Sequence, residues 1–187
     1  GSGNTRFSYD AKGRTIQTIK TIGTTPYTIS TAYDILDRTT DITYPNSTVV
    51  HYAYDAGGNL FEVTSGSTIF AHYSDYAATG QIGEILYGNL VQTTYQYNAA
   101  TSRLATLNTT GSTTLQNLSY GYDNVGNVTA IDDFLDRNRD QDFIYDHLNR
   151  LTQAQSPVYG TLTYAYNEIG NMTQNSQVGT YAYPAPG

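Results

Sequence analysis

Apolar and polar residues alternate along short stretches of the chain, and small or amide residues interrupt the alternation at regular intervals. The stretch Tyr52–Val63, YAYDAGGNLFEV, shows the pattern clearly. Tyr52 and Tyr54 alternate with an alanine, so both rings leave the same side of an extended strand. Leu60–Val63 continues beyond the interruption as a second short strand. The pattern predicts a β-hairpin whose chain reversal lies within Asp55–Gly58.

The interruption has the residue types of a tight turn. Asp suits the first position of a type I turn, because its carboxylate can accept hydrogen bonds from backbone N–H groups two residues on. Gly58 suits the left-handed position that follows, where a Cβ would clash. We therefore expect Asp55 and Gly58 to have structural roles in the turn.

The same unit recurs eight times, and its second tyrosine returns every 21–25 residues, which is typical of a repeat architecture. The left-handed position holds Gly, Asp or Asn, which tolerate a positive φ, except for Ser102 in a fifth copy with one extra turn residue. The fourth copy has Ala77 where Asp is expected. The predicted structural turn residues are Asp10, Gly13, Asp34, Asp37, Asp55, Gly58, Gly80, Asn98, Asp123, Gly126, Asp146, Asn149, Asn167 and Gly170. The predicted structural aromatic residues are Tyr9, Tyr33, Tyr52, Tyr54, Tyr76, Tyr95, Tyr97, Tyr120, Tyr122, Tyr145, Tyr164 and Tyr166.

A second, looser turn separates successive copies, for example at 44–47, 65–67, 87–89, 110–112 and 156–160. Each repeat is thus two strands and two turns, and the predicted fold is an all-β antiparallel meander of roughly 15 or 16 strands of about 5–7 residues. The segment Ile131–Gln141 is expected to be an exposed loop. We assign 7–183 to one repeat array, 1–6 to an N-terminal tail or expression remnant, and 184–187 to a C-terminal tail.

Composition and charge narrow the function classes. The chain has a net charge of −7, which argues against nucleic-acid binding, and it has no basic run for a membrane surface. It has no apolar stretch of the roughly 20 residues that a membrane helix needs. Cysteine is absent, so disulfides and thiolate metal sites are excluded, and no cofactor is expected.

The recurring string aromatic-x-Tyr-Asp-x-x-Gly-Arg/Asn resembles the YD repeats of the RHS family, over nearly the whole chain from Phe7 to Tyr183. The resemblance implies a β-hairpin strip that spirals into a large hollow shell. In bacterial RHS and insecticidal toxin-complex proteins this shell surrounds a toxic C-terminal domain, and a similar barrel in teneurins serves adhesion. It further implies a secreted or cell-surface bacterial protein. None of the five prolines follows an Asp, so the family's DPxG-type self-cleavage region is not carried over.

Three sets of polar residues were weighed for chemistry. The repeated Asp residues form an evenly spaced row rather than the facing pair that glycoside hydrolysis needs, so we expect no enzyme activity. The loop residues Asp136, Asn138, Asp140 and Asp142 resemble a calcium loop weakly, because Gln141 replaces its glycine and His147 its bidentate glutamate. The histidines lie far apart in the sequence, without the spacing of a metal site.

The sequence therefore predicts a non-enzymatic wall segment whose partners are neighbouring repeats and an enclosed toxin or effector domain. Open edge strands predict self-association. The alternative is a glycan-binding or adhesion module, since tyrosine offers sugars an apolar face with a polar tip. A four-bladed propeller of paired repeats fits less well, because the repeat lengths show no period of two copies.

Overall fold

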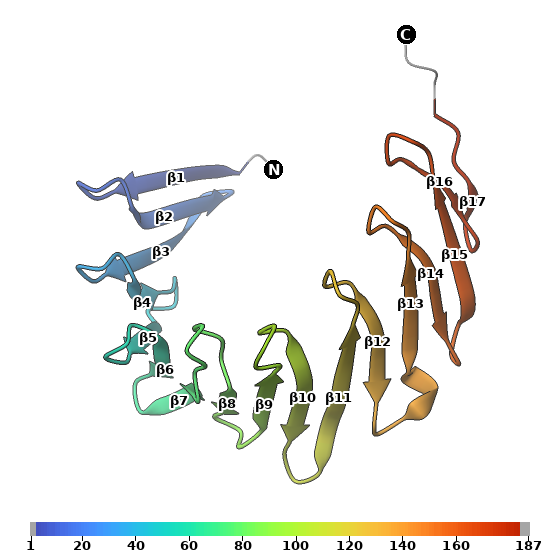
Figure 1. The fold of residues 1–187 in the computed structure, drawn as a ribbon. Helices are drawn as coiled ribbons and strands as arrows, with labels where there is room; N and C mark the ends of the chain where they lie inside the picture. The colour runs from blue at the N-terminus through green and yellow to red at the C-terminus, as the bar shows by residue number, and fades with distance from the viewer. Residues whose placement is uncertain (1–2, 184–187) are drawn as a thin grey trace. The chain divides into compact units, whose positions relative to one another are not determined.

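The computed structural model describes residues 3–183 and consists of β-strands joined by turns, with a single 3-10 turn (Figure 1). The chain divides into two compact units, residues 1–92 and 93–187. Each unit is an antiparallel meander in which every strand pairs with the next one along the chain. The prediction of an all-β meander of hairpins is confirmed.

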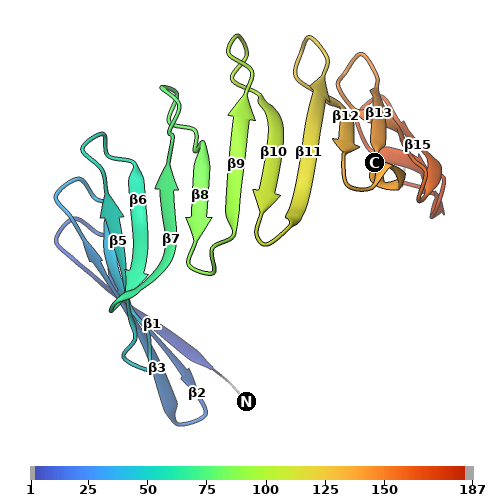
Figure 2. The ribbon, with the colours of Figure 1, turned by 90° about the horizontal axis from the view of Figure 1, so that it is seen from below.

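The first unit contains four hairpins, whose strands lie side by side in chain order (Figure 2). The turns within the repeats join β1 to β2, β3 to β4 and β5 to β6, and the fourth copy joins β7 to β8. The strands are β1 (Asn4–Tyr9), β2 (Thr15–Ile22), β3 (Thr25–Tyr33), β4 (Thr39–Thr43), β5 (Val49–Tyr54), β6 (Leu60–Ser65), β7 (Thr68–Ser74) and β8 (Glu84–Tyr87).

The second unit repeats the arrangement, starting from β9 at the unit boundary. A 3-10 turn, η1, lies in the connection between its fourth and fifth strands. The elements are β9 (Gln92–Tyr97), β10 (Leu104–Thr110), β11 (Thr114–Tyr122), β12 (Val128–Asp133), η1 (Arg137–Arg139), β13 (Gln141–Tyr145), β14 (Leu151–Ser156), β15 (Gly160–Tyr166), β16 (Met172–Asn175) and β17 (Gly179–Thr180).

Two details differ from the sequence prediction. Seventeen strands lie within the described residues, against the 15 or 16 expected, because the short β17 adds one more pairing partner for β16. The segment Ile131–Gln141 was expected to be a loop, which is wrong at both ends. Ile131 belongs to β12 and Gln141 opens β13, and these two residues pair with each other. Cross-strand pairing thus outweighs the polar composition of the segment.

Six of the eight repeat hairpins have the same irregularity at the second tyrosine. The strand register shifts just before the second tyrosine in the hairpins that end at Tyr9, Tyr33, Tyr54, Tyr122, Tyr145 and Tyr166. A type I turn followed by a left-handed residue inserts one extra residue opposite the partner strand, which is a β-bulge. The turn chemistry therefore sets the register of each hairpin.

Neither unit has a conventional hydrophobic core. Within the described residues only Ala71, Ala154, Thr93 and Ser156 are buried, and no large side chain is fully buried. Most strand residues are half-buried, because no second layer covers either face of the sheet. Polar contacts between neighbouring repeats must therefore contribute much of the stability that a packed core supplies in other domains.

Candidate functional site: contacts between repeats

In seven of the eight repeats the turn is closed by the side-chain oxygen of its first residue, which is Asp in five copies and Asn in two. In the first repeat the Oδ1 atom of Asp10 accepts hydrogen bonds from the backbone N–H groups of Lys12 at 2.9 Å and Arg14 at 3.0 Å. The N–H of Gly13 donates to the carbonyl oxygen of Asp10 at 3.0 Å. The same pattern recurs at Asp34, where the donors are the N–H groups two and four residues on. It is found again at Asp55, Asp123, Asp146, Asn98 and Asn167, each with part or all of this set of donors.

In all eight copies the residue at the left-handed position has a positive φ, whatever its type. The glycines Gly13, Gly58, Gly80, Gly126 and Gly170 have φ between 81° and 107°, and Asp37 and Asn149 have φ of 66° and 59°. Ser102 also has a positive φ of 55°, and its N–H donates to the carbonyl of Asn98 at 2.7 Å across the longer turn. The fourth copy keeps the geometry without a carboxylate, since the N–H of Gly80 donates to the Ala77 carbonyl at 2.8 Å.

In five places along the chain, the second tyrosine of a repeat binds the backbone of the repeat before it. Its hydroxyl donates to the carbonyl of the first strand residue after the preceding turn, so it ties one hairpin to the next. The donor and acceptor pairs are Tyr33 to Thr15 at 2.9 Å, Tyr54 to Thr39 at 2.8 Å, Tyr76 to Leu60 at 2.6 Å, Tyr166 to Leu151 at 2.9 Å and Tyr183 to Met172 at 2.8 Å.

An arginine after the left-handed residue reinforces the same junction. Arg14 binds its own turn through Asp10, with Nε at 2.7 Å from Oδ2, and its Nη1 reaches the Asp34 carbonyl of the next turn at 3.2 Å. Its guanidinium lies 4.7 Å from the centre of the Tyr33 ring, within the range of a cation–π interaction. Arg38 stacks on Tyr54 at 4.3 Å and Arg150 on Tyr166 at 4.9 Å, and each binds its own turn Asp at 2.7 Å.

The turn carboxylates are held in their ionised form. The hydrogen bond from the backbone N–H of Arg38 has the largest effect and lowers the pKa of Asp34; partial burial opposes it, and the Arg38 guanidinium lowers the pKa further. The corresponding groups of Arg150 lower the pKa of Asp146. At Asp10 partial burial acts to raise the pKa, but the hydrogen bonds from Arg14 and Lys12 together outweigh it, and the pKa is lowered.

The first tyrosines contribute packing. In β5, Tyr52 and Tyr54 are half-buried while His51 and Ala53 are exposed, so the two rings share the more covered face. Burial raises the pKa of the Tyr52 and Tyr120 hydroxyls. The further predicted tyrosines Tyr95, Tyr97, Tyr145 and Tyr164 are half-buried too, and burial raises the pKa of Tyr97 and Tyr145. Tyr9, in the first copy, is exposed and stacks on Phe7 with ring centres 6.5 Å apart.

Sequence reasoning missed the role of the arginines. The position after the left-handed residue holds Arg or Asn in seven of the eight copies and Gln81 in the fourth, and we assigned it no function. The signal was available, because an Arg four residues after an Asp can reach its carboxylate once the turn forms. An Asn at this position also binds the turn Asp of its own repeat, although its side chain is shorter than that of Arg. Asn59 binds the Asp55 carboxylate with its amide at 3.1 Å, and Asn127 binds Asp123 at 2.8 Å.

The calcium-like residues are not brought together. Asp136 caps η1 by accepting from the N–H of Asn138 at 3.1 Å, and Asp140 accepts from the N–H of Asp133 at 2.7 Å. Arg137 and Arg139 form ion pairs with Asp140 and Asp136. Asp142 lies within β13. Within residues 3–183 no group of three or more His, Asp or Glu side chains is arranged to hold a metal ion.

The chain that makes these repeated contacts matches a known family. The family model described as Teneurin YD-shell matches residues 2–178, which is nearly the whole chain. The chain belongs to this family. The YD-shell repeat is thus the hairpin seen here, with its tyrosine bonded to the preceding hairpin.

Relatives of the YD-shell chain occur in bacterial toxins. It is 30% identical to the toxin subunit YenC1 of Yersinia entomophaga over 72% of the chain, and it spans 17% of the length of that relative. A crystal structure of TcdB2-TccC3 matches 95% of this chain, and 12% of its own chain, at 24% identity with a TM-score of 0.76. The Tc holotoxin pore of Photorhabdus luminescens matches 95% of this chain, and 11% of its own, at 23% identity with a TM-score of 0.73. These structures share the fold of the YD-shell chain, which is a structural module.

Proposed function

We propose that the chain is a segment of the wall of a hollow β-shell, and that this shell encloses a toxin or effector domain within a larger secreted or surface protein of bacteria. The segment acts by enclosure and performs no reaction of its own. A continuous hydrogen-bonded sheet excludes proteases and other macromolecules from the interior.

The observation that carries this proposal is a single sheet with no second layer over it, in which side chains bind from one repeat to the next. A domain that acts alone buries a core, and the described residues bury only four small side chains. Contacts between repeats instead run along the strip, from each turn to the tyrosine of the next hairpin. Such a strip suits a wall, whose two faces meet the interior and the exterior.

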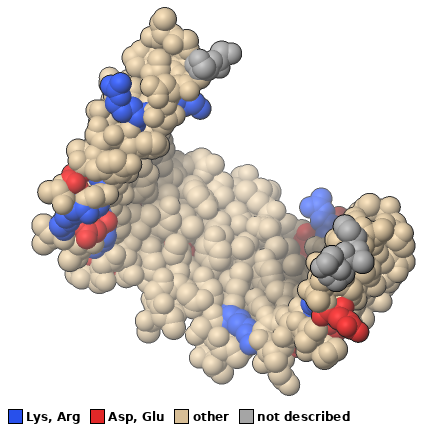
Figure 3. All heavy atoms as spheres, turned by 90° about the horizontal axis from the view of Figure 1, so that it is seen from above, with Lys and Arg blue, Asp and Glu red and all other residues tan. Residues whose placement is uncertain are grey.

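The surface chemistry supports the same role. Few charged side chains lie on the face seen in Figure 3. As a separate finding, the part of the chain that the structure describes contains no candidate membrane-spanning helix. The polar groups of the turns form hydrogen bonds with one another and with the backbone, so their role is structural. Glycan binding is the competing prediction, and retention of the chain on a glycan array but not of its tyrosine variants would favour it.

The proposal is tested by protease accessibility in the full-length gene product that contains this chain. We expect the enclosed domain to resist trypsin in the native protein and to become accessible in the triple variant Arg14→Gln, Arg38→Gln, Arg150→Gln, which loses three inter-repeat arginines. The control replaces Arg6, Arg137 and Arg139 by Gln, which changes the net charge equally at exposed positions. Rapid digestion of that domain in the native protein would contradict enclosure.

A further inference from the structure

Arginine in this repeat is accompanied by an acidic residue. Copies one, two and seven have Arg after the left-handed position, and each begins its turn with Asp. In all three the guanidinium and the carboxylate form an ion pair at 2.6–2.7 Å. The copies that begin with Asp but lack Arg use Asn, whose amide donates to the carboxylate instead.

The fifth copy breaks this rule. It has Arg103 but begins its turn with Asn98, and its turn is one residue longer. The Oδ1 atom of Asn98 accepts from the N–H groups of Ala100 and Thr101, both at 3.0 Å, so the amide is used within the turn. Among the described residues no carboxylate lies within ion-pairing distance of Arg103. Its half-buried positive charge is therefore not neutralised by the chain.

Arg103 is nonetheless held in place. Its Nη1 donates to the carbonyl of Asp123 at 2.8 Å, and its guanidinium lies 5.6 Å from the centre of the Tyr122 ring. A guanidinium has five N–H donors, and this is the one bond assigned to it within residues 3–183. The nearby Asp123 carboxylate is used within its own turn, where Oδ1 accepts from three backbone N–H groups and Oδ2 from the Asn127 amide.

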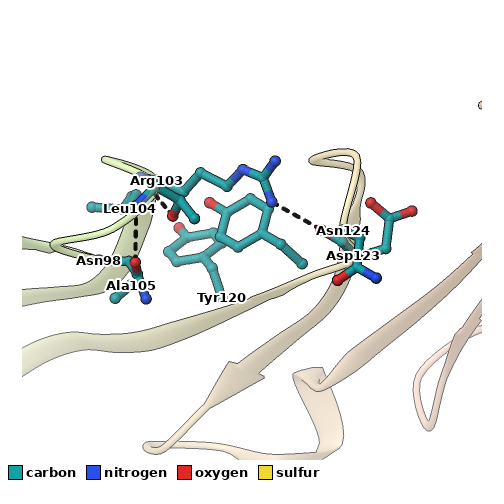
Figure 4. Close-up of a pocket in the computed structure, with 9 residues that line it drawn as sticks. Asn98, Arg103, Leu104, Ala105, Tyr120, Asp123 and Asn124 are labelled. Carbon is teal, nitrogen blue, oxygen red and sulfur yellow. Dashed lines mark hydrogen bonds between the residues drawn. The ribbon is translucent and has the colours of Figure 1, made fainter.

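A pocket of about 350 Å³ lies beside this arginine. Figure 4 shows the Arg103 side chain extending past Tyr120 toward the turn at Asp123 and Asn124. The rings of Tyr120 and Tyr122 form part of the lining, with polar groups from Asn98 and Asn124. Asp123 also lines the pocket, with its carboxylate bound within its own turn. The pocket thus offers the Arg103 guanidinium, aromatic faces and amide groups in a space that fits one side chain or one sugar ring.

We propose that this pocket binds a carboxylate group, which would neutralise Arg103 as the turn Asp neutralises the arginine in the other arginine-bearing copies. The carboxylate would pair with the free N–H groups of Arg103 in a charge-assisted hydrogen bond, while the rest of the ligand lies against Tyr120 or Tyr122. The ligand class is a compact carboxylate, either an acidic side chain of a polypeptide or an acidic sugar. This site does not depend on the enclosure proposed above.

The test is a titration of the chain followed by NMR at the backbone N–H groups of Leu104, Ala105 and Asn124. The probes are acetyl-glutamate amide and D-glucuronate, each with its neutral counterpart, acetyl-glutamine amide and D-glucose. We expect saturable shifts with the two carboxylates and none with the neutral compounds. The carboxylate that binds more tightly identifies the source, and equal responses to charged and neutral probes would overturn the proposal.

Two variants of the fifth turn sharpen the result. Arg103→Gln should weaken carboxylate binding by about tenfold or more, since it removes a charged hydrogen-bond donor. Asn98→Asp should weaken it similarly, because an internal carboxylate then competes for Arg103, and this variant keeps the arginine that stabilises the fold. Arg139→Gln is the control, since Arg139 is exposed and pairs with Asp136 away from the pocket, and it should bind as the native chain does. Unchanged binding in Asn98→Asp would contradict the proposal.

Discussion

The tyrosine hydroxyl is the smallest unit of this structure that joins one repeat to another. Each bond runs from a half-buried ring to a carbonyl at the start of the preceding returning strand, at 2.6–2.9 Å. An unpaired carbonyl at such a position costs free energy, so the bond is worth more than its equivalent in water. Phenylalanine would keep the packing of the ring and remove only the bond.

We expect Tyr54→Phe and Tyr166→Phe each to lower the free energy of unfolding by about 1 kcal/mol, because each leaves one backbone carbonyl without its donor. The two residues lie in different units, so their effects should add. Urea unfolding followed by circular dichroism measures both. Tyr27→Phe, at an exposed position, is the control and should change little. An equal loss of unfolding free energy in Tyr27→Phe would show that the destabilisation does not come from these hydrogen bonds.

Substitutions at two left-handed turn positions should have opposite effects on the free energy of unfolding. Gly80→Ala should cost about 1–2 kcal/mol of unfolding free energy, because φ is 81° there and a Cβ is strained in that region. Leu90 has a φ of 65° and a side chain that is 79% exposed, so Leu90→Gly should gain about 0.5–1 kcal/mol by relieving strain without losing packing. Thermal melts of both variants check the signs, and a destabilised Leu90→Gly would show that the strain estimate is wrong.

At the scale of the hairpin, ionised carboxylates close the turns. Their pKa values are lowered by folding, below an ordinary value of 3.8, at Asp34 and Asp146. A lowered pKa means that the contribution to stability is complete above the unfolded value and is lost as the pH falls through the folded value. The hairpins are therefore stabilised at neutral pH and weakened by acid.

We expect the midpoint of thermal unfolding to stay nearly constant from about pH 8 to pH 5 and to fall steeply below about pH 4. The double variant Asp34→Asn, Asp146→Asn should be less stable at neutral pH and less sensitive to acid, because two of the titrating groups are gone. Circular dichroism melts across this pH range measure both. A native chain whose melting midpoint is constant down to pH 2 would contradict the proposed role of the carboxylates.

Much of the hairpin was predictable from residue types, and the reason is local. A turn of Asp-x-x-Gly determines its own backbone, so the bulge at the tyrosine and the strand positions follow from a few neighbouring residues. The partners of the tyrosine hydroxyls and the arginines were not predictable in this way. They lie 15–18 residues away in the sequence for the hydroxyls, and only the pairing of strands in space brings them together.

The same limit applies to the looser turns, for which no backbone conformation was predicted, and to the loop that was wrongly predicted at Ile131–Gln141. Leu90 and Ser47 hold left-handed positions in the looser turns, although neither residue type favours a positive φ. The pairing of the strands on either side imposes that conformation on them. Ile131 and Gln141 likewise pair across a polar connection that composition alone marks as a loop.

At the scale of the whole molecule, stability is shared along the strip. β1 pairs with β2, and all six of its residues are exposed, including the stacked Phe7 and Tyr9. Phe7 is 51% exposed and Tyr9 58%. In later copies the equivalent tyrosine binds a preceding repeat, so this strand presents a surface built for a further hairpin. An exposed edge strand of this kind favours pairing between chains.

We expect the chain to self-associate, with a sedimentation coefficient that rises with concentration. Phe7→Glu together with Tyr9→Glu should reduce the association, because each chain then carries two added negative charges on its edge strand β1, and these charges repel those of a second chain. Ile35→Glu, at an exposed turn, adds charge away from β1 and serves as the control. A native chain that sediments as a monomer at every concentration would refute this prediction.

The absence of a shared core has a consequence for how such arrays change in length. Each hairpin is bonded to the hairpins on either side, so a copy can be gained or lost while the remaining junctions keep their contacts. Duplication of a single unit of twenty-odd codons would extend the wall by one hairpin without any new packing having to evolve. Variation in the number of hairpins from one protein to another would then cost little, and selection could adjust the length of the array one hairpin at a time.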